Sequence, residues 1–154
     1  MRMVIQRVTS VSLNADGVPY DQMDKGILAM VGIQSGDDNE KVMSYMMDKL
    51  IHLRIFEDEN DKMNLSIQDL GLGLFLVSNF TLYGDCRHGR RPSYSSGAPV
   101  EEASRIYEKF LTYARQYAKD VGVEVHSGLF QADMQIDVHL SGPVTLLLDS
   151  DKVF

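Results

Sequence analysis

Ser141-Gly142-Pro143-Val144-Thr145, followed by the apolar residues 146–148, is the most informative stretch of this 154-residue chain. A Gly-Pro step normally marks a turn, but the residues after it have the apolar character of a buried strand. A proline can begin a strand, whereas inside one it cannot donate to the hydrogen-bond ladder. We therefore expect Gly142 and Pro143 at the mouth of a buried strand over residues 143–148, with main-chain carbonyls free to face a ligand.

A second stretch has the same character. Ser78-Asn79-Phe80-Thr81-Leu82 follows an apolar run at residues 72–77, and this run predicts a buried strand. Both stretches place hydroxyl side chains and free main-chain groups at the end of a strand. Two such ends in a small protein favour a site that is built largely from main chain.

The composition predicts one domain, spanning residues 1–154. A hydrophobic fraction of 44% can fill a single core, and the one cysteine, Cys86, excludes an internal disulfide framework. Such cysteine usage is typical of a reducing compartment, so we expect a cytoplasmic protein. The first residues become polar too soon for a signal peptide, and no apolar run approaches the roughly 20 residues of a membrane helix. We expect no membrane association.

The distribution of charge along the chain limits the kinds of molecule that the protein can bind. A formal net charge of -7 argues against indiscriminate binding to nucleic acid. The densest positive cluster is Arg87-His88-Gly89-Arg90-Arg91, within a loop-like region over residues 84–97. An acidic body with one basic loop suits a protein that contacts a polyanion at one place.

Hydrophobic periodicity predicts the elements. Helical spacing of apolar residues indicates two helices, over residues 38–52 and 99–121. Pro99 suits the first position of the second helix, and Gly122 suits the place just after its end. The expected strands span residues 3–10 (continuing or pairing through 11–15), 26–33, 53–56, 72–77, 123–126, 132–140 and 143–148, with a polar loop over 57–64. Two helices among many strands indicate a sheet-rich α/β fold.

The common catalytic and cofactor motifs do not occur in the sequence. The four histidines are scattered and form neither an HExxH motif nor a Cys/His pair, so we expect no metal. No glycine-rich phosphate loop is present either, and we expect no cofactor. Thr81 and Thr145 carry hydroxyls, but a threonine nucleophile needs an adjacent base, and the sequence offers none beside either residue.

Further blocks of sequence accompany the two strand ends. They are Val4-Ile5-Gln6-Arg7-Val8, Leu53-Arg54-Ile55-Phe56-Glu57-Asp58, Lys62-Met63-Asn64-Leu65-Ser66, Phe80-Thr81-Leu82-Tyr83-Gly84-Asp85-Cys86-Arg87, Gly89-Arg90-Arg91-Pro92-Ser93, Ala132-Asp133-Met134 and Gly142-Pro143-Val144-Thr145. Together, and in this order, they resemble the D-aminoacyl-tRNA deacylase family of the bacterial and eukaryotic type, nearly from end to end. Three places depart from the family pattern: Asn79 replaces the usual Gln, Gln131 the usual Gly, and Leu140-Ser141 the usual Asn-Asp.

The resemblance implies a fold and an assembly. The fold is a three-layer α/β/β domain with a mixed, largely antiparallel, barrel-like sheet and two main helices. Family members are homodimers in which the Gly142-Pro143 peptide is cis and enters the neighbouring subunit's pocket. Its carbonyls hold the α-ammonium of the substrate, so that an L-side chain collides with backbone whereas a D-side chain or glycine does not. Arg7 matches the arginine that buttresses this segment.

The resemblance also implies a reaction, which is hydrolysis of the ester of D-aminoacyl-tRNA, with Gly-tRNA(Ala) as a further substrate. Ser78, Phe80 and Thr81 are the expected catalytic residues, because backbone N–H groups near Phe80 and Thr81 stabilise the oxyanion. The reaction relies on the terminal adenosine's 2′-hydroxyl and a water. The expected substrate-binding residues are Arg7, Ala132, Met134, Gly142, Pro143, Val144 and Thr145, and the expected tRNA contacts are Arg87, Arg90 and Arg91.

Three alternatives stay open from the sequence. One is a sister deacylase that edits a mischarged L-aminoacyl-tRNA through a trans Gly-Pro step and a wider pocket. Another is a non-catalytic RNA-binding homologue, for which the departures at Asn79, Gln131 and Ser141 are the support. The weakest is a threonine-nucleophile hydrolase of small esters, because no base accompanies the threonines.

Overall fold

The computed structural model describes residues 1–153. In chain order the elements are β1 (Arg2–Ala15), β2 (Val18–Met23), β3 (Gly26–Gly32), α1 (Glu40–His52), β4 (Phe56–Glu57), β5 (Met63–Leu65), α2 (Ile67–Leu70), β6 (Gly73–Ser78), the 3-10 turn η1 (Phe80–Tyr83), α3 (Val100–Asp120), β7 (Val125–Ser127) and β8 (Met134–Asp149).

The main sheet is mixed and nearly closed into a barrel, as the family resemblance implies. Its order is β2-β1-β3-β6-β7, and β8 lies along the other side of β1. The pairs that involve β1 are antiparallel, whereas β3–β6 and β6–β7 are parallel. Asp21 on β2 joins the two ends of this order, because its carboxylate accepts hydrogen bonds from the Ser127 amide (3.0 Å) and pairs with His126 Nδ1 (2.9 Å) on β7.

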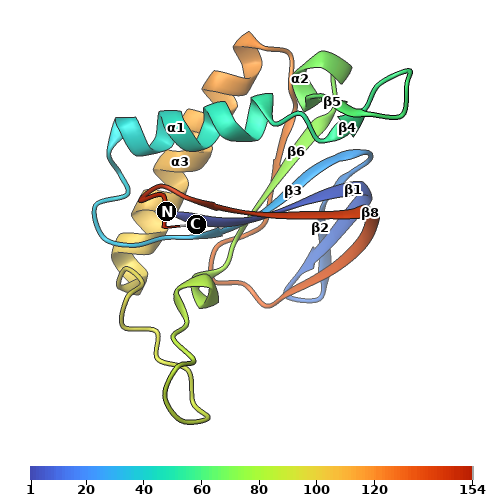
Figure 1. Cartoon of the computed structure of the whole chain (residues 1–154). Helices are drawn as coiled ribbons and strands as arrows, with labels where there is room; N and C mark the ends of the chain where they lie inside the picture. Colours follow the sequence, from blue (N-terminus) through green and yellow to red (C-terminus); the bar gives the residue numbers. More distant parts are fainter. Residues whose placement is uncertain (154) are drawn as a thin grey trace.

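The layers follow from where the apolar side chains lie. Helices α1 and α3 cover one face of the sheet (Figure 1) and bury their stripes, which include Met43, Leu50 and Phe110, against it. A second cluster, which includes Leu13 and Phe75, fills the space inside the curled sheet. The result is the predicted three-layer arrangement of helices, sheet and second sheet arm, and α1 and α3 are the two predicted helices.

The helix ends have ordinary chemical causes. The side chain of Asn39 caps α1 by accepting a hydrogen bond from the Lys41 amide at 2.9 Å. The short helix α2 was not predicted. It starts with a capping box, in which the Ser66 and Asp69 side chains each bond the other's backbone amide, and this Ser-x-x-Asp spacing is visible in the sequence.

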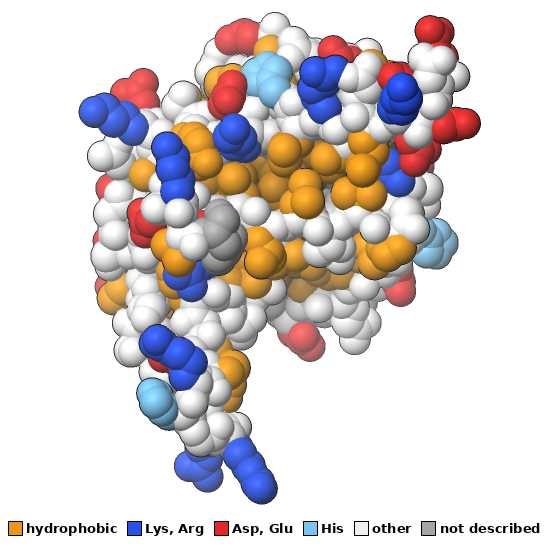
Figure 2. Space-filling model, viewed as in Figure 1, with side chains coloured by type: hydrophobic (Ala, Val, Ile, Leu, Met, Phe, Trp, Pro, Cys, Tyr) orange, Lys and Arg blue, Asp and Glu red, His pale blue; other side chains and the backbone are white. Residues whose placement is uncertain are grey.

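Two predictions about strands were wrong. Residues 143–148 do not form a separate buried strand but are the second arm of β8, where Leu146 is 37% and Leu147 59% exposed. An apolar run predicts burial only if both faces of the strand are covered, and the described residues leave the outer face of this arm open. Figure 2 shows a hydrophobic band there. The other prediction placed a strand over residues 53–56, but only Phe56–Glu57 is extended, and it pairs with β5, which begins inside the predicted loop.

Candidate active site

A cavity of about 460 Å³ lies where β6 ends. Strand β6 delivers Ser78 to its wall, and the chain then turns into η1, so that Asn79 and Phe80 also face it. The rest of the wall is mostly apolar and comes from β3, the start of α3 and the segment before β8. It consists of Val31, Ile33, Ala98, Val100, Ala103, Phe130, Gln131, Ala132 and Met134.

The walls are held together at one carbonyl. The Leu76 oxygen accepts hydrogen bonds from Tyr107 Oη on α3 at 2.9 Å and from the Gly128 amide at 2.8 Å. Tyr107 is fully buried, and this burial raises the pKa of its phenol, so it remains a donor. The Ala98 amide donates to the Ile33 oxygen at 2.9 Å. Four separate segments are thus fixed around the end of β6.

Two main-chain N–H groups just after β6, next to the cavity wall, have no backbone partner among the described residues, although Thr81 itself does not line the cavity. The first bond of the η1 turn runs from the Leu82 amide to the Asn79 oxygen at 3.3 Å. The amides of Phe80 and Thr81 precede that bond, as the first N–H groups of a helical turn do. The Thr81 hydroxyl donates to the Asn79 side-chain oxygen at 2.5 Å, so its proton is engaged by an amide oxygen, which is no general base. The chemistry that this arrangement suits is the stabilisation of a negative oxygen.

Gln131 has an unusual backbone conformation at the rim of the cavity. Its φ of 67° lies in the left-handed region, which glycine adopts freely and other residues rarely. The turn is fixed on both sides: the Ala132 amide donates to the Leu129 oxygen at 3.4 Å, and the Asp133 amide donates to the Asp16 carboxylate at 3.0 Å. The position at which glycine is usual in the family pattern is therefore one that requires a glycine-like conformation.

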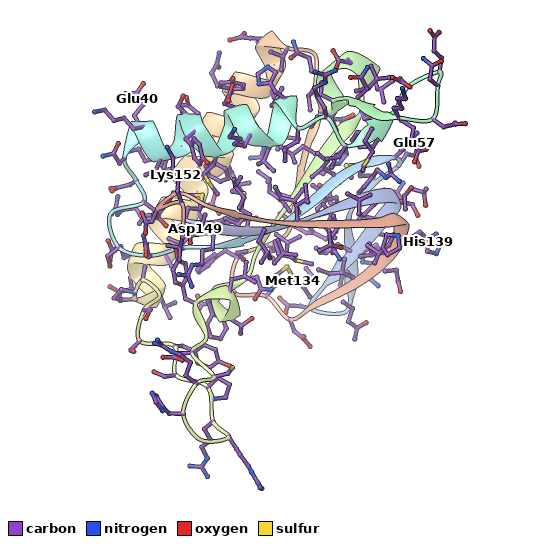
Figure 3. All side chains as sticks on the ribbon, viewed as in Figure 1. Glu40, Glu57, Met134, His139, Asp149 and Lys152 are labelled. Atoms are coloured by element: carbon purple, nitrogen blue, oxygen red, sulfur yellow. The ribbon has the colours of Figure 1, made fainter. Side chains whose placement is uncertain are left out.

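Gly142 and Pro143 do not line this cavity, and neither do Val144 and Thr145. Along β8, Leu140 pairs with Val8 and Thr145 with Gln6, so residues 141–144 lie opposite Arg7 alone and bulge out of the ladder. The Gly142–Pro143 peptide is cis. Figure 3 shows the two arms of β8, with Met134 on one, Asp149 on the other and His139 near the bend between them.

Arg7 holds this bend. Its buried guanidinium donates to the Ser141 oxygen (3.3 Å) and the Ile55 oxygen (2.8 Å), and it pairs with the Glu57 carboxylate at 3.3 Å. A Cβ on Gly142 would lie 3.0 Å from Arg7 Nη2, and Gly142 has a φ of +114°. Only glycine meets both conditions. The structure thus brings Arg7 to the Gly-Pro segment, and Ser78, Phe80, Ala132 and Met134 to the cavity, as two separate groups.

The three arginines of the basic loop are not equivalent. Arg87 forms two side-chain hydrogen bonds with the Asp85 carboxylate, at 2.9 and 2.7 Å, and these bonds, together with one from the Arg87 amide, lower the pKa of that carboxyl to about 2. Among the described residues, Arg90 and Arg91 form no ion pair, and both are exposed. The loop extends away from the body, with basic side chains at its tip (Figures 1 and 2). Arg90 and Arg91 therefore have the charges that are free for a polyanion.

Sequence reasoning missed several cavity walls. Val100 and Ala103 fall on the apolar stripe of the helix predicted from residue 99 onward, which predicts that they pack in the core, but Val100 is exposed and both line the cavity. The position of Val100 at the very start of that helix was a usable signal. Phe130 carries no local signal, because only the tertiary fold brings it to Ser78. Within residues 1–153, no three His, Cys, Asp or Glu side chains converge on a possible metal position. In the same part of the chain, the helices are too short or too polar to span a membrane.

Comparison with known proteins identifies the family. The family model described as D-Tyr-tRNA(Tyr) deacylase matches residues 4–149. A D-aminoacyl-tRNA deacylase of Fervidobacterium nodosum is 50% identical over 154 residues, which is 100% of both chains. The D-aminoacyl-tRNA deacylase of Clostridioides difficile has the same identity and coverage.

Solved structures agree with this relationship. The c-Myc DNA Unwinding Element Binding Protein is 32% identical, covers 97% of this chain with 98% of its own, and superposes with a TM-score of 0.87. A probable eukaryotic D-amino acid tRNA deacylase is 16% identical over 96% of this chain and 97% of its own, with a TM-score of 0.79, which shows the common fold. The protein is thus an enzyme of the hydrolase class. It belongs to the D-Tyr-tRNA(Tyr) deacylase family.

Proposed function

We propose that this enzyme hydrolyses the ester of D-aminoacyl-tRNA and releases the free D-amino acid and tRNA. The observation that carries the proposal is the cavity at the end of β6, where the first main-chain amides of η1 lie beside Ser78. The chain that forms this cavity has 50% sequence identity to two D-aminoacyl-tRNA deacylases over its whole length.

The proposed chemistry needs no protein nucleophile. A water adds to the ester carbonyl, the bond from that carbon to the ribose oxygen breaks, and the ribose oxygen takes up a proton with the help of the neighbouring 2′-hydroxyl. The amides of Phe80 and Thr81 stabilise the oxyanion, and one such donor is typically worth about 2.7–4 kcal/mol. The bond from the Thr81 hydroxyl to Asn79 supports this view, because the hydroxyl has no base to activate it.

We further propose that chirality is selected across a homodimer. Residues 141–144 bulge from β8, do not line the cavity of their own chain, and are well placed to enter the cavity of a second copy. The exposed side chains of Leu140, Leu146 and Leu147 offer that copy an apolar contact. In this arrangement the carbonyls of Gly142 and Pro143 bind the α-ammonium, and Ala132, Met134, Val144 and Thr145 shape the surroundings. An L-side chain is excluded sterically, while glycine, which lacks one, is accepted, as in Gly-tRNA(Ala).

The basic loop supplies the contact to the rest of the tRNA. Arg90 and Arg91 are the main candidates for phosphate binding. Arg87 is a further candidate, and in this arrangement it contacts a phosphate without breaking its ion pair with Asp85. Phosphate contacts of this kind position a nucleic acid without reading its sequence.

The test compares D-Tyr-tRNA with L-Tyr-tRNA as substrates of the purified protein. We expect rapid release of D-tyrosine and almost none of L-tyrosine. The negative control is the Ala132→Phe variant, in which the phenyl ring fills part of the cavity and is expected to stop the release of D-tyrosine. Equal rates for the two esters, or no release from either, would refute the proposal, and preferential release of the L-amino acid would identify a sister deacylase that edits L-aminoacyl-tRNA.

A further inference from the structure

Two exposed aromatic rings stand between the cavity and the basic loop. Phe80 is 65% and Tyr94 41% exposed, and their rings meet edge to face with centroids 5.1 Å apart. Phe80 also lines the cavity, whereas Tyr94 lies where the basic loop returns toward α3. Large apolar side chains are normally covered, so an exposed aromatic pair at the edge of a site points to something that binds there.

The pair is held in place by the loop's own backbone. Asp85 and Ser93 form a two-bond bridge at the base of the loop, with distances of 2.7 and 3.0 Å. The Gly97 amide donates to the Tyr94 oxygen at 3.2 Å. Gly84 leaves room for the tyrosine, because a Cβ there would lie 3.0 Å from the Tyr94 ring. The ring of Tyr94 is therefore positioned against Phe80, and not left to move freely.

The surroundings favour a nucleic acid as the partner. Arg90 and Arg91 lie on the same loop, just before Tyr94, and carry charges that are not neutralised by ion pairs within residues 1–153. Proteins that bind single-stranded nucleic acid combine basic side chains that follow the backbone with exposed aromatic rings on which bases stack. The order along this surface is cavity, aromatic pair, basic tip.

We propose that Phe80 and Tyr94 form a stacking platform for the unpaired bases next to the 3′-terminal nucleotide of the tRNA. The inference rests on the proposed function, because it takes the terminal nucleotide and its amino acid to occupy the cavity. Tyr94 is then a positioning residue, which orients the single-stranded end as it enters the site. The basic tip beyond the platform contacts the phosphates of the same strand.

The kinetic test uses Tyr94→Leu with two substrates, D-Tyr-tRNA and the D-tyrosyl ester of adenosine, which lacks the neighbouring bases. Loss of one stacked base raises KM for the tRNA by about 5- to 150-fold. The adenosine ester should be hydrolysed as before, and Tyr94→Phe, which keeps the ring, should restore the tRNA value. An equal change with both substrates, or no change with either, would overturn the platform. If the unmodified enzyme hydrolyses neither ester, the proposed function fails instead.

A binding test is independent of hydrolysis. The chain has no tryptophan, so Tyr94→Trp introduces a single tryptophan into the platform, and its fluorescence can be excited selectively over that of the tyrosines. We expect its fluorescence to be quenched by a short single-stranded RNA that has the sequence of the tRNA 3′ end. Tyr20→Trp is the matched control, because Tyr20 is 48% exposed on β2, and it should not respond. Equal responses at both positions, or a change of oligomeric state in Tyr94→Leu, would show that the pair is not a nucleic-acid platform.

Discussion

The cavity at the end of β6 and the bend of β8 at residues 141–144 are built in opposite ways. The cavity is enclosed by several elements that meet at the Leu76 carbonyl, which accepts two hydrogen bonds. The bend lies outside the ladder, and Arg7 is the side chain that ties it to the body. One chain thus carries an enclosed cavity and, elsewhere on its surface, a well-defined bend at residues 141–144 that does not reach this cavity. This difference is the basis of our proposal that a second copy of the chain completes the site.

The largest effect is expected from Gly142→Ala, which changes the bend alone. A Cβ at this position conflicts with Arg7 and Val144, each 3.0 Å away, and the φ of +114° is unfavourable for alanine. A misplacement of about 1 Å in a positioning group can cost about 10²-fold in rate. We expect kcat on D-Tyr-tRNA to fall by about that factor in a variant that still shows one cooperative thermal unfolding transition. A variant within a few-fold of the original rate would show that the bend takes no part in the reaction.

Arg7→Met tests whether the bend at residues 141–144 must be held in place by Arg7, because it leaves the residues of the bend itself unchanged. The change removes the donors to the Ser141 and Ile55 oxygens from a buried place. A buried acceptor left without its donor costs about 1–3 kcal/mol, so denaturant unfolding should show a loss of that size. The rate on D-Tyr-tRNA should fall as well. Arg7→Lys keeps the charge and a single donor nitrogen, so it should recover part of both losses. If neither variant changes the rate, Arg7 does not position the bend.

The two regions also differ in what the sequence reveals about them. The end of β6, the two helices and the place of Gly142 were predictable, because each depends on short-range signals: an apolar run that stops at Ser78, a helical stripe, and a Gly-Pro step. The walls at Phe130 and Val100 were not, because only the tertiary fold brings them to the cavity.

The error at residues 146–148 has a different cause. An apolar run shows that a surface avoids water, but it does not show whether the same chain covers it. Leu146 and Leu147 read as core residues, and the structure places them on an open face of β8. Gln131 is a different case. The sequence shows that glutamine replaces the usual glycine at this position, but it does not show the left-handed φ that explains why glycine is usual there.

Gln131→Gly tests the cavity side with a smaller effect. A non-glycine residue in the left-handed conformation costs roughly 1–2 kcal/mol, and glycine's greater freedom in the unfolded chain offsets part of this gain. We expect a slightly higher free energy of unfolding and a change in KM, because the side chain leaves the cavity rim. Gln131→Ala removes the amide without relieving the backbone, so it should alter KM without raising stability. A loss of stability in the glycine variant would contradict this view of the turn.

The smallest effect is expected from Thr81→Ala. Its hydroxyl is bonded to Asn79 and is not the nucleophile in the proposed reaction, whereas the main-chain amide remains after the substitution. Most of the rate on D-Tyr-tRNA should therefore be retained. Complete loss of hydrolysis in a variant that still folds would indicate a covalent mechanism through the threonine.

The central claim, a site shared between two copies, is tested most directly by mixing two defective subunits. Gly142→Ala has an intact cavity and Ala132→Phe an intact bend, so their heterodimer contains one complete site. Purification through two different C-terminal tags is suitable, because the Met1 ammonium is buried against Asp37 at 2.6 Å. We predict that the Gly142→Ala homodimer keeps about a hundredth of the original rate on D-Tyr-tRNA and that the Ala132→Phe homodimer releases no D-tyrosine. The heterodimer should have about half the original rate per dimer, since one of its two equivalent sites is complete. A heterodimer as inactive as its parents, or a protein that is monomeric while active, would contradict the claim.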